Sequence, residues 1–323
     1  MSVPTTASPG ESVPGPASWL AGNPRLRMFQ TLVRREFWEH RSLWIAPLVV
    51  SGLLLLSALW THGALRIDAA EASEWLDARN KAIVFALALW GLTIPHYLVM
   101  IVVLNFYLLD CLYAERKDRS ILFWKSLPVS DGATVAAKMF TGSVLVPFGT
   151  FALALVTDVL FTAIWDARAV LGHSPELVAW DTVAFLKTQT LMLLGLIISI
   201  LWYAPFLGIF VLASAWVRRN VLLWVTLVPL LAVIVERIAF GTHYLYSLLG
   251  YRTDGIWESL HVESAVLGSL TNVGPAEVVS IPGVYDRVHV GPAFINIDLW
   301  LGLAVAIACA YAAARIRRYR DDT

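Results

Sequence analysis

Charged residues are scarce in this chain: Asp, Glu, Lys and Arg make up only 15% of its 323 residues. A soluble domain has about a quarter of its residues charged and about half apolar. Here 58% of residues are hydrophobic, and the mean hydropathy is +0.67. The net charge is zero and basic clusters are confined to expected loops, so we expect no nucleic-acid partner. This composition predicts a protein embedded in membrane lipid.

Cysteine is rare, and common catalytic motifs are missing. Cys111 and Cys309 have no metal or redox spacing and predict no disulfide, so reduced thiols are expected. The sequence contains no GxxxxGK[ST] phosphate loop, no HExxH and no GxSxG. Its seven histidines include no pair at metal-ligand spacing. We therefore expect a chain that is not an enzyme and that binds no cofactor or metal itself.

Long apolar runs are abundant, and a helix needs about 20 such residues to cross a bilayer. Six segments meet this requirement: 43–63, 82–110, 136–164, 183–215, 221–240 and 299–314. The second, third and fourth exceed a perpendicular span, so they are expected to tilt or project beyond the bilayer. The sequence thus predicts an all-α membrane protein with a six-span transmembrane domain at 43–320.

The distribution of Lys and Arg predicts the orientation, because cytoplasmic segments carry an excess of both. With the N-terminus inside, most of the 24 basic residues fall on the cytoplasmic side. These are Arg25, Arg27, Arg34, Arg35, Arg41, Arg116, Lys117, Arg119, Lys125, Lys138, Arg218, Arg219, Arg315, Arg317, Arg318 and Arg320. Both termini are therefore expected in the cytoplasm, and a bacterial inner membrane is the expected location.

Three segments lie outside the spans. Residues 1–24 are rich in Pro, Ser and Gly and predict a disordered tail. Residues 25–42 form a basic amphipathic pattern, which predicts a helix lying at the lipid headgroups; an ordinary lead-in helix is the alternative. The long outer loop at 241–298 predicts a folded cap or gate, with a helix at 256–270 and extended pieces at 272–296.

Several polar residues fall within spans, where burial is costly and usually has a reason. His96, Asn105 and Glu236 are candidates for a translocation path. The alternative gives His96 and Asn105 interhelical hydrogen bonds, and places Glu236 and Asp158 near span ends or in ion pairs. Because only His96 is expected near the membrane midplane, proton-coupled transport has little support.

The hydrophilic loop at 111–136 is the most distinctive stretch. Ile121, Trp124 and Leu127 recur at three-residue steps, which predicts a short helix with these side chains on one face. Pro128 is expected to end that helix, and Ser130 or Asp131 to cap the next one. This combination of charged, aromatic and apolar residues predicts a docking surface for another protein.

This stretch carries a resemblance. Glu115–Arg116, then Arg119–Ser120–Ile121–Leu122, then Ser126–Leu127–Pro128–Val129–Ser130 and Lys138 resemble the cytoplasmic loop of ABC-2-type transporter permeases. The six spans, the amphipathic first helix and the elaborate last outer loop are similar to that family as well. Asp118–Arg119 differs from the glycine-threonine turn of many members.

The resemblance implies a permease dimer, identical or mixed, with two separate cytoplasmic ATPase subunits that bind the ATP. The loop helix would be the coupling helix that docks on the ATPase, with Phe123, Trp124 and Leu127 as anchors. The docking residues implied are Glu115, Arg119, Ser120, Phe123, Trp124, Lys125, Leu127 and Pro128. Glu115 would also pair with Arg34 or Arg35. The implied function is that of the permease subunit of an ATP-driven exporter. The alternatives are a secondary carrier without an ATPase and a non-transporting membrane scaffold or sensor.

Overall fold

The computed structural model describes residues 24–60, 78–172, 180–259 and 291–319. All regular structure in these ranges is helical. All of the predicted tail at 1–24 except Pro24, and most of the predicted extended segment at 272–296, lie outside them. Within 272–296 the described residues form α15 (Gly291–Ile295), so the prediction of extended chain is wrong there.

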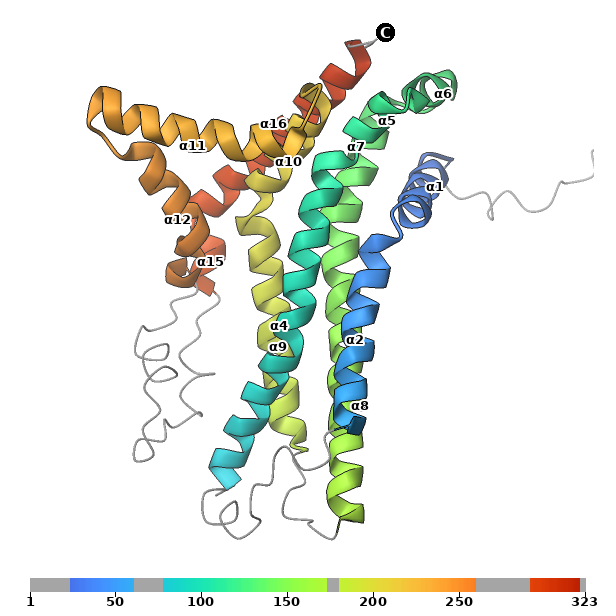
Figure 1. The fold of residues 1–323 in the computed structure, drawn as a ribbon, viewed down its shortest axis with the longest axis vertical. Helices are drawn as coiled ribbons and strands as arrows, with labels where there is room; N and C mark the ends of the chain where they lie inside the picture. The colour runs from blue at the N-terminus through green and yellow to red at the C-terminus, as the bar shows by residue number, and fades with distance from the viewer. Residues whose placement is uncertain (1–23, 61–77, 173–179, 260–290, 320–323) are drawn as a thin grey trace, which may run out of the picture.

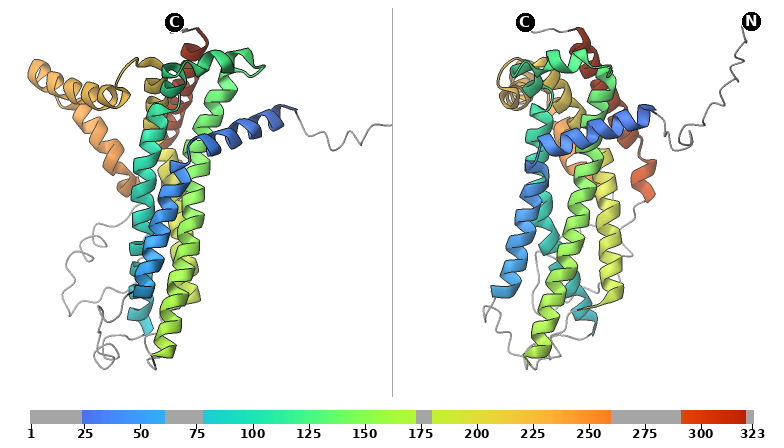
Figure 2. Two further views of the ribbon diagram at one scale, coloured as in Figure 1. Left: turned by 45° about the vertical axis from the view of Figure 1, so that its right-hand side comes forward. Right: turned by 90° about the vertical axis from the view of Figure 1, so that its right-hand side faces the viewer.

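Four long helices run side by side along the long axis of the molecule (Figure 1). They are α2 (Ser42–Trp60), α4 (Ala78–Asp110), α8 (Val146–Leu171) and α9 (Thr182–Trp202). α10 (Ala204–Trp216) continues beyond α9 and packs against α16 (Ile297–Tyr319). α1 (Pro24–Glu39) crosses near the end of the bundle that also carries the C-terminal end of α16 (Figure 2). We call this the terminal end of the bundle.

Six helices among the described residues are long and apolar enough to cross a membrane, which confirms the predicted number. They are Ser42–Trp60, Phe85–Lys117, Asp131–Leu171, Thr182–Trp202, Val221–Phe240 and Ile297–Tyr319. The third is longer than predicted at both ends. It consists of α7 (Asp131–Phe140), a π-helical turn (Thr141–Leu145) and α8. It begins where Ser130 Oγ accepts a hydrogen bond from the Ala133 amide at 3.2 Å, as the capping prediction required.

The predicted fourth span, 183–215, is two helices rather than one. The chain breaks at Tyr203 between α9 and α10, and Pro205 lies in the first turn of α10. Proline has no amide hydrogen and therefore fits the first turn of a helix better than its interior. Hydropathy alone does not reveal this break because both helices are strongly apolar.

α11 (Val221–Phe240) has the predicted bounds of the fifth span but a different direction. Figures 1 and 2 show that it starts beside α10 and projects sideways from the bundle, roughly perpendicular to the long axis. It starts at Asn220, whose φ of 52° turns the chain in a conformation that Asn tolerates better than most residues. The turn after α11 therefore lies toward the terminal end, whereas the prediction placed it at the opposite end. α12 (Tyr244–Ser259) then returns to the bundle. Of the helix predicted at 256–270, residues 256–259 form the end of α12, and the rest lies outside the described residues.

α10 and α16 pack closely against each other at Gly208. A Cβ atom built on Gly208 would lie 2.7 Å from the Cα of Ala306. Only a residue without a side chain permits this backbone approach. Next to this contact, Leu43, Leu108, Val146 and Val211 share one buried core that joins α2, α4, α8 and α10.

Candidate functional site

The hydrophilic loop between α4 and α7 folds into two short helices at the terminal end. α5 (Tyr113–Lys117) is followed by Arg119, which has a φ of 57°, and by α6 (Ser120–Ser126). α6 ends at Leu127, whose backbone is extended before Pro128, as a residue preceding proline prefers. The short helix and its end at Pro128 are thus as predicted.

The side chains of α6 divide into an inward and an outward set. Ile121 is buried, and Trp124 lies beneath the Arg35 guanidinium, whose carbon is 3.4 Å from the ring centroid. Leu122 and Phe123 point outward and are 57% and 60% exposed. Trp124, predicted as an anchor for a partner, therefore binds α1 within this chain, and Leu122 takes its place on the exposed surface.

The other predicted docking residues also differ in exposure. Arg119 and Pro128 are exposed, Leu127 is 36% exposed, and Lys125 is half-buried. Ser120 Oγ donates to the Glu115 carbonyl at 3.4 Å and so stays within the loop. We define the exposed apolar surface of Leu122, Phe123 and Leu127 as the α6 knob.

Glu115 is 6% exposed and lies inside the protein, so a direct contact between its carboxylate and a docking partner is not expected. Its Oε1 accepts from Arg35 Nη2 at 3.2 Å and lies 3.2 Å from Lys138 Nζ. Its Oε2 pairs with Arg317 Nη1. The prediction that Glu115 pairs with Arg34 or Arg35 is therefore confirmed for Arg35. One carboxylate of the loop thus joins α1, α7 and α16.

A second buried carboxylate, Glu36 of α1, extends this cluster. Glu36 Oε1 accepts from Lys138 Nζ at 2.8 Å, and Glu36 Oε2 accepts from the Tyr107 hydroxyl at 3.0 Å. On the other side, Arg317 Nε donates to Asp131 Oδ1 at 2.9 Å. We call Arg35, Glu36, Glu115, Asp131, Lys138 and Arg317 the ion cluster; its three carboxylates balance three cations.

The loop is also joined to α10. Ser214 Oγ accepts from the backbone amides of Leu112 and Tyr113, both at 3.0 Å. Arg116 Nη2 donates to the carbonyls of Ser214 and Val217 at 2.6 and 2.8 Å. The loop is therefore bonded to four helices at the terminal end: α1, α7, α10 and α16. A displacement of α6 would be transmitted to the bundle through these contacts.

His40 lies beside the ion cluster, with its Nε2 3.6 Å from Glu36 Oε2. Burial lowers the pKa of His40 below its ordinary value of 6.5, although the negative charge of Glu36 acts in the opposite direction. Donor atoms of Glu36, Glu39 and His40 also lie within 4.8 Å of one another, a spacing that a metal ion could use. However, both Glu36 oxygens already accept hydrogen bonds, from Tyr107 and Lys138, and these bonds explain the arrangement without a metal ion.

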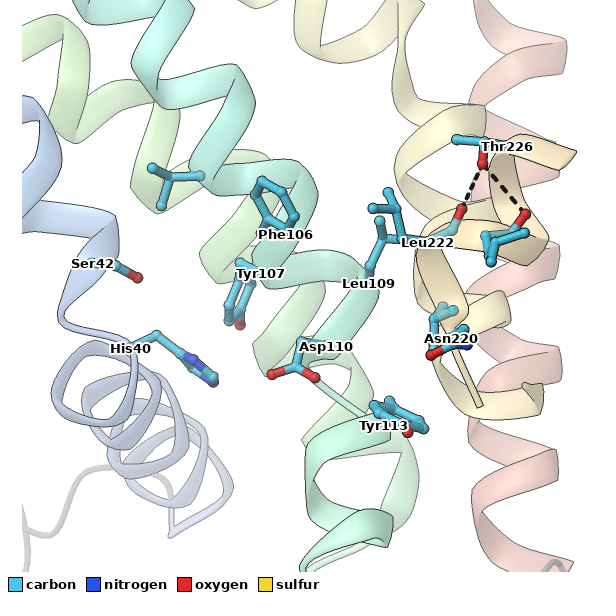
Figure 3. Close-up of a pocket in the computed structure, with 13 residues that line it drawn as sticks. His40, Ser42, Phe106, Tyr107, Leu109, Asp110, Tyr113, Asn220, Leu222 and Thr226 are labelled. Atoms are coloured by element: carbon cyan, nitrogen blue, oxygen red, sulfur yellow. Dashed lines mark hydrogen bonds between the residues drawn. The ribbon is translucent and has the colours of Figure 1, made fainter. Parts of the chain in front are cut away.

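A cavity of about 780 Å³ opens between the α1–α2 junction, α4 and the start of α11 (Figure 3). Its polar wall includes His40, Tyr107, Asp110 and Tyr113, and Figure 3 shows the Asp110 carboxylate between His40 and Tyr113. The other lining residues are Ser42, Val103, Phe106, Leu109, Asn220, Val221, Leu222, Leu223 and Thr226. The cavity suits a molecule with an apolar body and a polar head.

The three residues predicted for a translocation path lie in unlike surroundings. His96 is fully buried and its Nε2 is 2.9 Å from Ser51 Oγ, the interhelical hydrogen bond that the alternative interpretation predicted. Asn105 Nδ2 instead donates to the carbonyl of Ile101 in its own helix at 2.8 Å. Glu236 bridges the α11–α12 turn by accepting from the Tyr244 and Leu245 amides at 2.7 and 2.8 Å. Of these three residues, only His96 is fully buried in the bundle.

The position of Asp158 differs from the one that the sequence predicts. It was expected near a span end, but α8 continues to Leu171 and Asp158 is fully buried in the bundle. Its Oδ2 accepts from Gln189 Nε2 at 2.8 Å and from Thr93 Oγ1 at 3.2 Å. Thr93 and Gln189 are uncharged residues inside apolar runs. The three-residue spacing from His96 could have placed Thr93 on the same helix face, whereas no comparable signal marked Gln189.

No protein-family model matches the chain, and no match is found among curated proteins or solved structures.

Proposed function

We propose that this chain is the permease subunit of an ATP-driven exporter of the ABC-2 type, whose ATP hydrolysis occurs on a separate cytoplasmic subunit. The observation that supports this most is the α6 knob on a buried ionic base. Leu122 and Phe123 are exposed at the terminal end, and Glu115, in the preceding helix α5 of the same loop, is held by Arg35, Lys138 and Arg317. Exposed apolar patches of this kind mark docking sites for other proteins.

The proposed mechanism is mechanical coupling. The ATPase would hold Leu122 and Phe123 in a hydrophobic groove, because buried aromatic and apolar anchors supply most of the energy of an interface. Arg119, exposed on the same loop, would orient the docking electrostatically. Movement of α6 would pass through the ion cluster to α1, α7 and α16. Since packed helices move as rigid bodies, the displacement would reach the opposite end of the bundle.

Dimerisation is the second part of this proposal. α11 projects from the bundle, and only 11% of its apolar window is buried. In the proposed permease this helix contacts lipid or a second permease subunit, identical or related. With the terminal end in the cytoplasm of a bacterial inner membrane, α1 would lie at the headgroups of the inner leaflet, as its basic residues favour.

Copurification with the ATPase tests this proposal. Phe123→Asp should abolish copurification of a phosphate-loop ATPase and nucleotide-dependent transport, because it places a charge in the proposed docking groove. Leu171→Asp is the matched control: Leu171 is 77% exposed at the end of α8 opposite to α6, so the complex should survive. Loss in both variants, or in neither with normal expression, would overturn the docking assignment.

A secondary carrier without an ATPase is the second candidate. The buried residues Asp158 and His96 in the bundle favour it, because intramembrane ionisable groups commonly form proton relays. This candidate predicts transport by the purified chain in vesicles with a pH gradient and no nucleotide. Transport that requires an added ATPase and ATP would exclude it.

A further inference from the structure

Four helices bring a group of buried polar side chains together in the middle of the bundle. Ser51 comes from α2, Thr93 and His96 from α4, Thr157 and Asp158 from α8, and Gln189 from α9; we call them the polar belt. Ser51 lies nine residues from each end of the 19-residue α2. At the rise of an α-helix this is about 14 Å from either end, so the belt lies near the middle of a membrane-spanning segment.

Asp158 has an unequal set of hydrogen bonds. Both donors, Thr93 Oγ1 and Gln189 Nε2, bond to its Oδ2. Its Oδ1 is buried and has no hydrogen-bond partner among the residues that the structure describes. An ionised carboxylate spreads its charge over both oxygens and is stabilised by donors at each, whereas a carboxylic acid accepts mainly at its carbonyl oxygen and carries the hydrogen on the other. The pattern therefore matches a neutral acid with Oδ2 as the carbonyl.

The charges around Asp158 do not compensate an ionised carboxylate. Among the described residues, no Lys or Arg forms an ion pair with it, and α2 contains no titratable side chain. α4 contributes His96 and the Tyr97 hydroxyl, α8 carries Asp166 and Arg168 two turns or more away, and Lys187 of α9 is exposed. A buried, unpaired carboxylate is strongly unfavourable in a medium of low dielectric constant, so a proton on Asp158 lowers the free energy.

We propose that Asp158 is a proton-binding site, occupied and occluded in this conformation. This inference does not depend on the ATPase docking proposed above. Asp158 has no exposed surface, so exchange of its proton requires the helices around it to move apart.

His96 is suited to receive such a proton. Its Nδ1 lies 3.0 Å from the Leu92 carbonyl, which can only accept, so Nδ1 carries a hydrogen. In the neutral ring Nε2 then accepts from Ser51 Oγ. Ser51 Oγ also lies 3.2 Å from the Pro47 carbonyl, to which it can donate instead when Nε2 is protonated. His96 can therefore change its charge without losing either hydrogen bond, while Thr157 Oγ1 donates to Ser51 at 3.0 Å.

Infrared difference spectroscopy of the full chain in lipid vesicles tests the proposal. At neutral pH we expect the carbonyl stretch of a protonated carboxylic acid in the wild type and its loss in Asp158→Asn. Asp254→Asn is the matched control, since Asp254 is exposed on α12 and its replacement should leave the band unchanged. A wild type without the band, or a band that persists in Asp158→Asn, overturns the proposal.

Gln189→Leu keeps the test decisive if Asp158→Asn does not fold. This variant removes one hydrogen bond to the carbonyl oxygen, so the band should move to higher frequency; a band at its wild-type frequency would show that it belongs to another group. Spectra in sodium and in choline buffers distinguish a proton from Na⁺. A band that disappears when sodium replaces choline would identify a Na⁺ site and overturn the proposal.

Discussion

Replacing Lys138 by methionine tests whether the ion cluster holds the loop to the bundle. Lys138 is 1% exposed, and its ammonium lies 2.8 Å from Glu36 Oε1 and 3.2 Å from Glu115 Oε1. Methionine retains much of the side-chain volume but carries no charge. In Lys138→Met the three carboxylates of the cluster face only two cations, Arg35 and Arg317.

The expected loss follows from which carboxylate remains unpaired. Breaking a buried ion pair by removing one partner costs about 3–5 kcal/mol. Glu115 keeps contacts with Arg35 and Arg317, whereas Glu36 keeps only the Tyr107 hydroxyl and the partly buried His40 nearby. Most of the cost therefore arises at Glu36, and we expect a loss of about 3 kcal/mol in the free energy of unfolding.

A double variant separates this cause from a packing defect. Adding Glu36→Gln removes the carboxylate that Lys138→Met leaves unpaired, so the double variant should be less destabilised than the sum of the single variants by about 1–3 kcal/mol. The free energy of unfolding of the purified chain in mixed micelles measures all three. Glu39→Gln is the control, because Glu39 pairs with Arg35 at 2.9 Å but is 44% exposed, and its loss should cost at most about 1 kcal/mol. Additive single effects, or a Lys138→Met loss no larger than that of Glu39→Gln, would refute the reasoning.

Three further predictions concern other parts of the fold. Gly208→Val should lower the free energy of unfolding by about 1–3 kcal/mol or more, because the valine side chain would overlap the α16 backbone. Gly195→Ala is the control: no atom lies within 4 Å of the new Cβ, so this variant should be neutral or stabilised. Denaturant titration measures both. Glu236→Gln should speed amide hydrogen exchange in the first turn of α12 and leave α8 unchanged, because the carboxylate accepts from two amides there; equal exchange would contradict this role. Because the pKa of His40 is lowered in the folded state, the unfolded chain binds more protons just below pH 6.5, so stability should fall as the pH drops through that range. His40→Gln should flatten this pH dependence of the unfolding midpoint, and an unchanged slope would assign it to another group.

The boundaries of the loop helices could be predicted because they depend on neighbouring residues. Pro128 ends α6, and Ser130 begins α7 through its own hydroxyl. Which side chains of α6 face solvent could not be predicted in the same way, because that depends on contacts with other helices. Three-residue spacing placed Trp124 on a face with Ile121 but did not reveal that Arg35 covers its ring.

The polar residues within the spans show the same limit. The hydrophobic pattern identified His96 as a mid-span residue, whereas Asp158 was misplaced because the apolar window of the third span ended seven residues before α8 does. Glu236 looked like a residue of a path because it lies in an apolar run. Its three accepted hydrogen bonds come from the turn that follows and from α12, whose position relative to α11 the sequence pattern did not indicate.

The sequence by itself determined that this chain is a set of apolar helices for a lipid environment, because apolar run length and missing charge are local properties that act on each segment separately. The tertiary structure alone decided which charges meet: Lys138 reaches Glu36 across 102 residues, and Arg317 reaches Glu115 across 202. It also decided that α11 projects sideways from the bundle and that Asp158 is buried within the bundle. Such contacts depend on how several helices pack at once, and no single stretch of sequence contains that information.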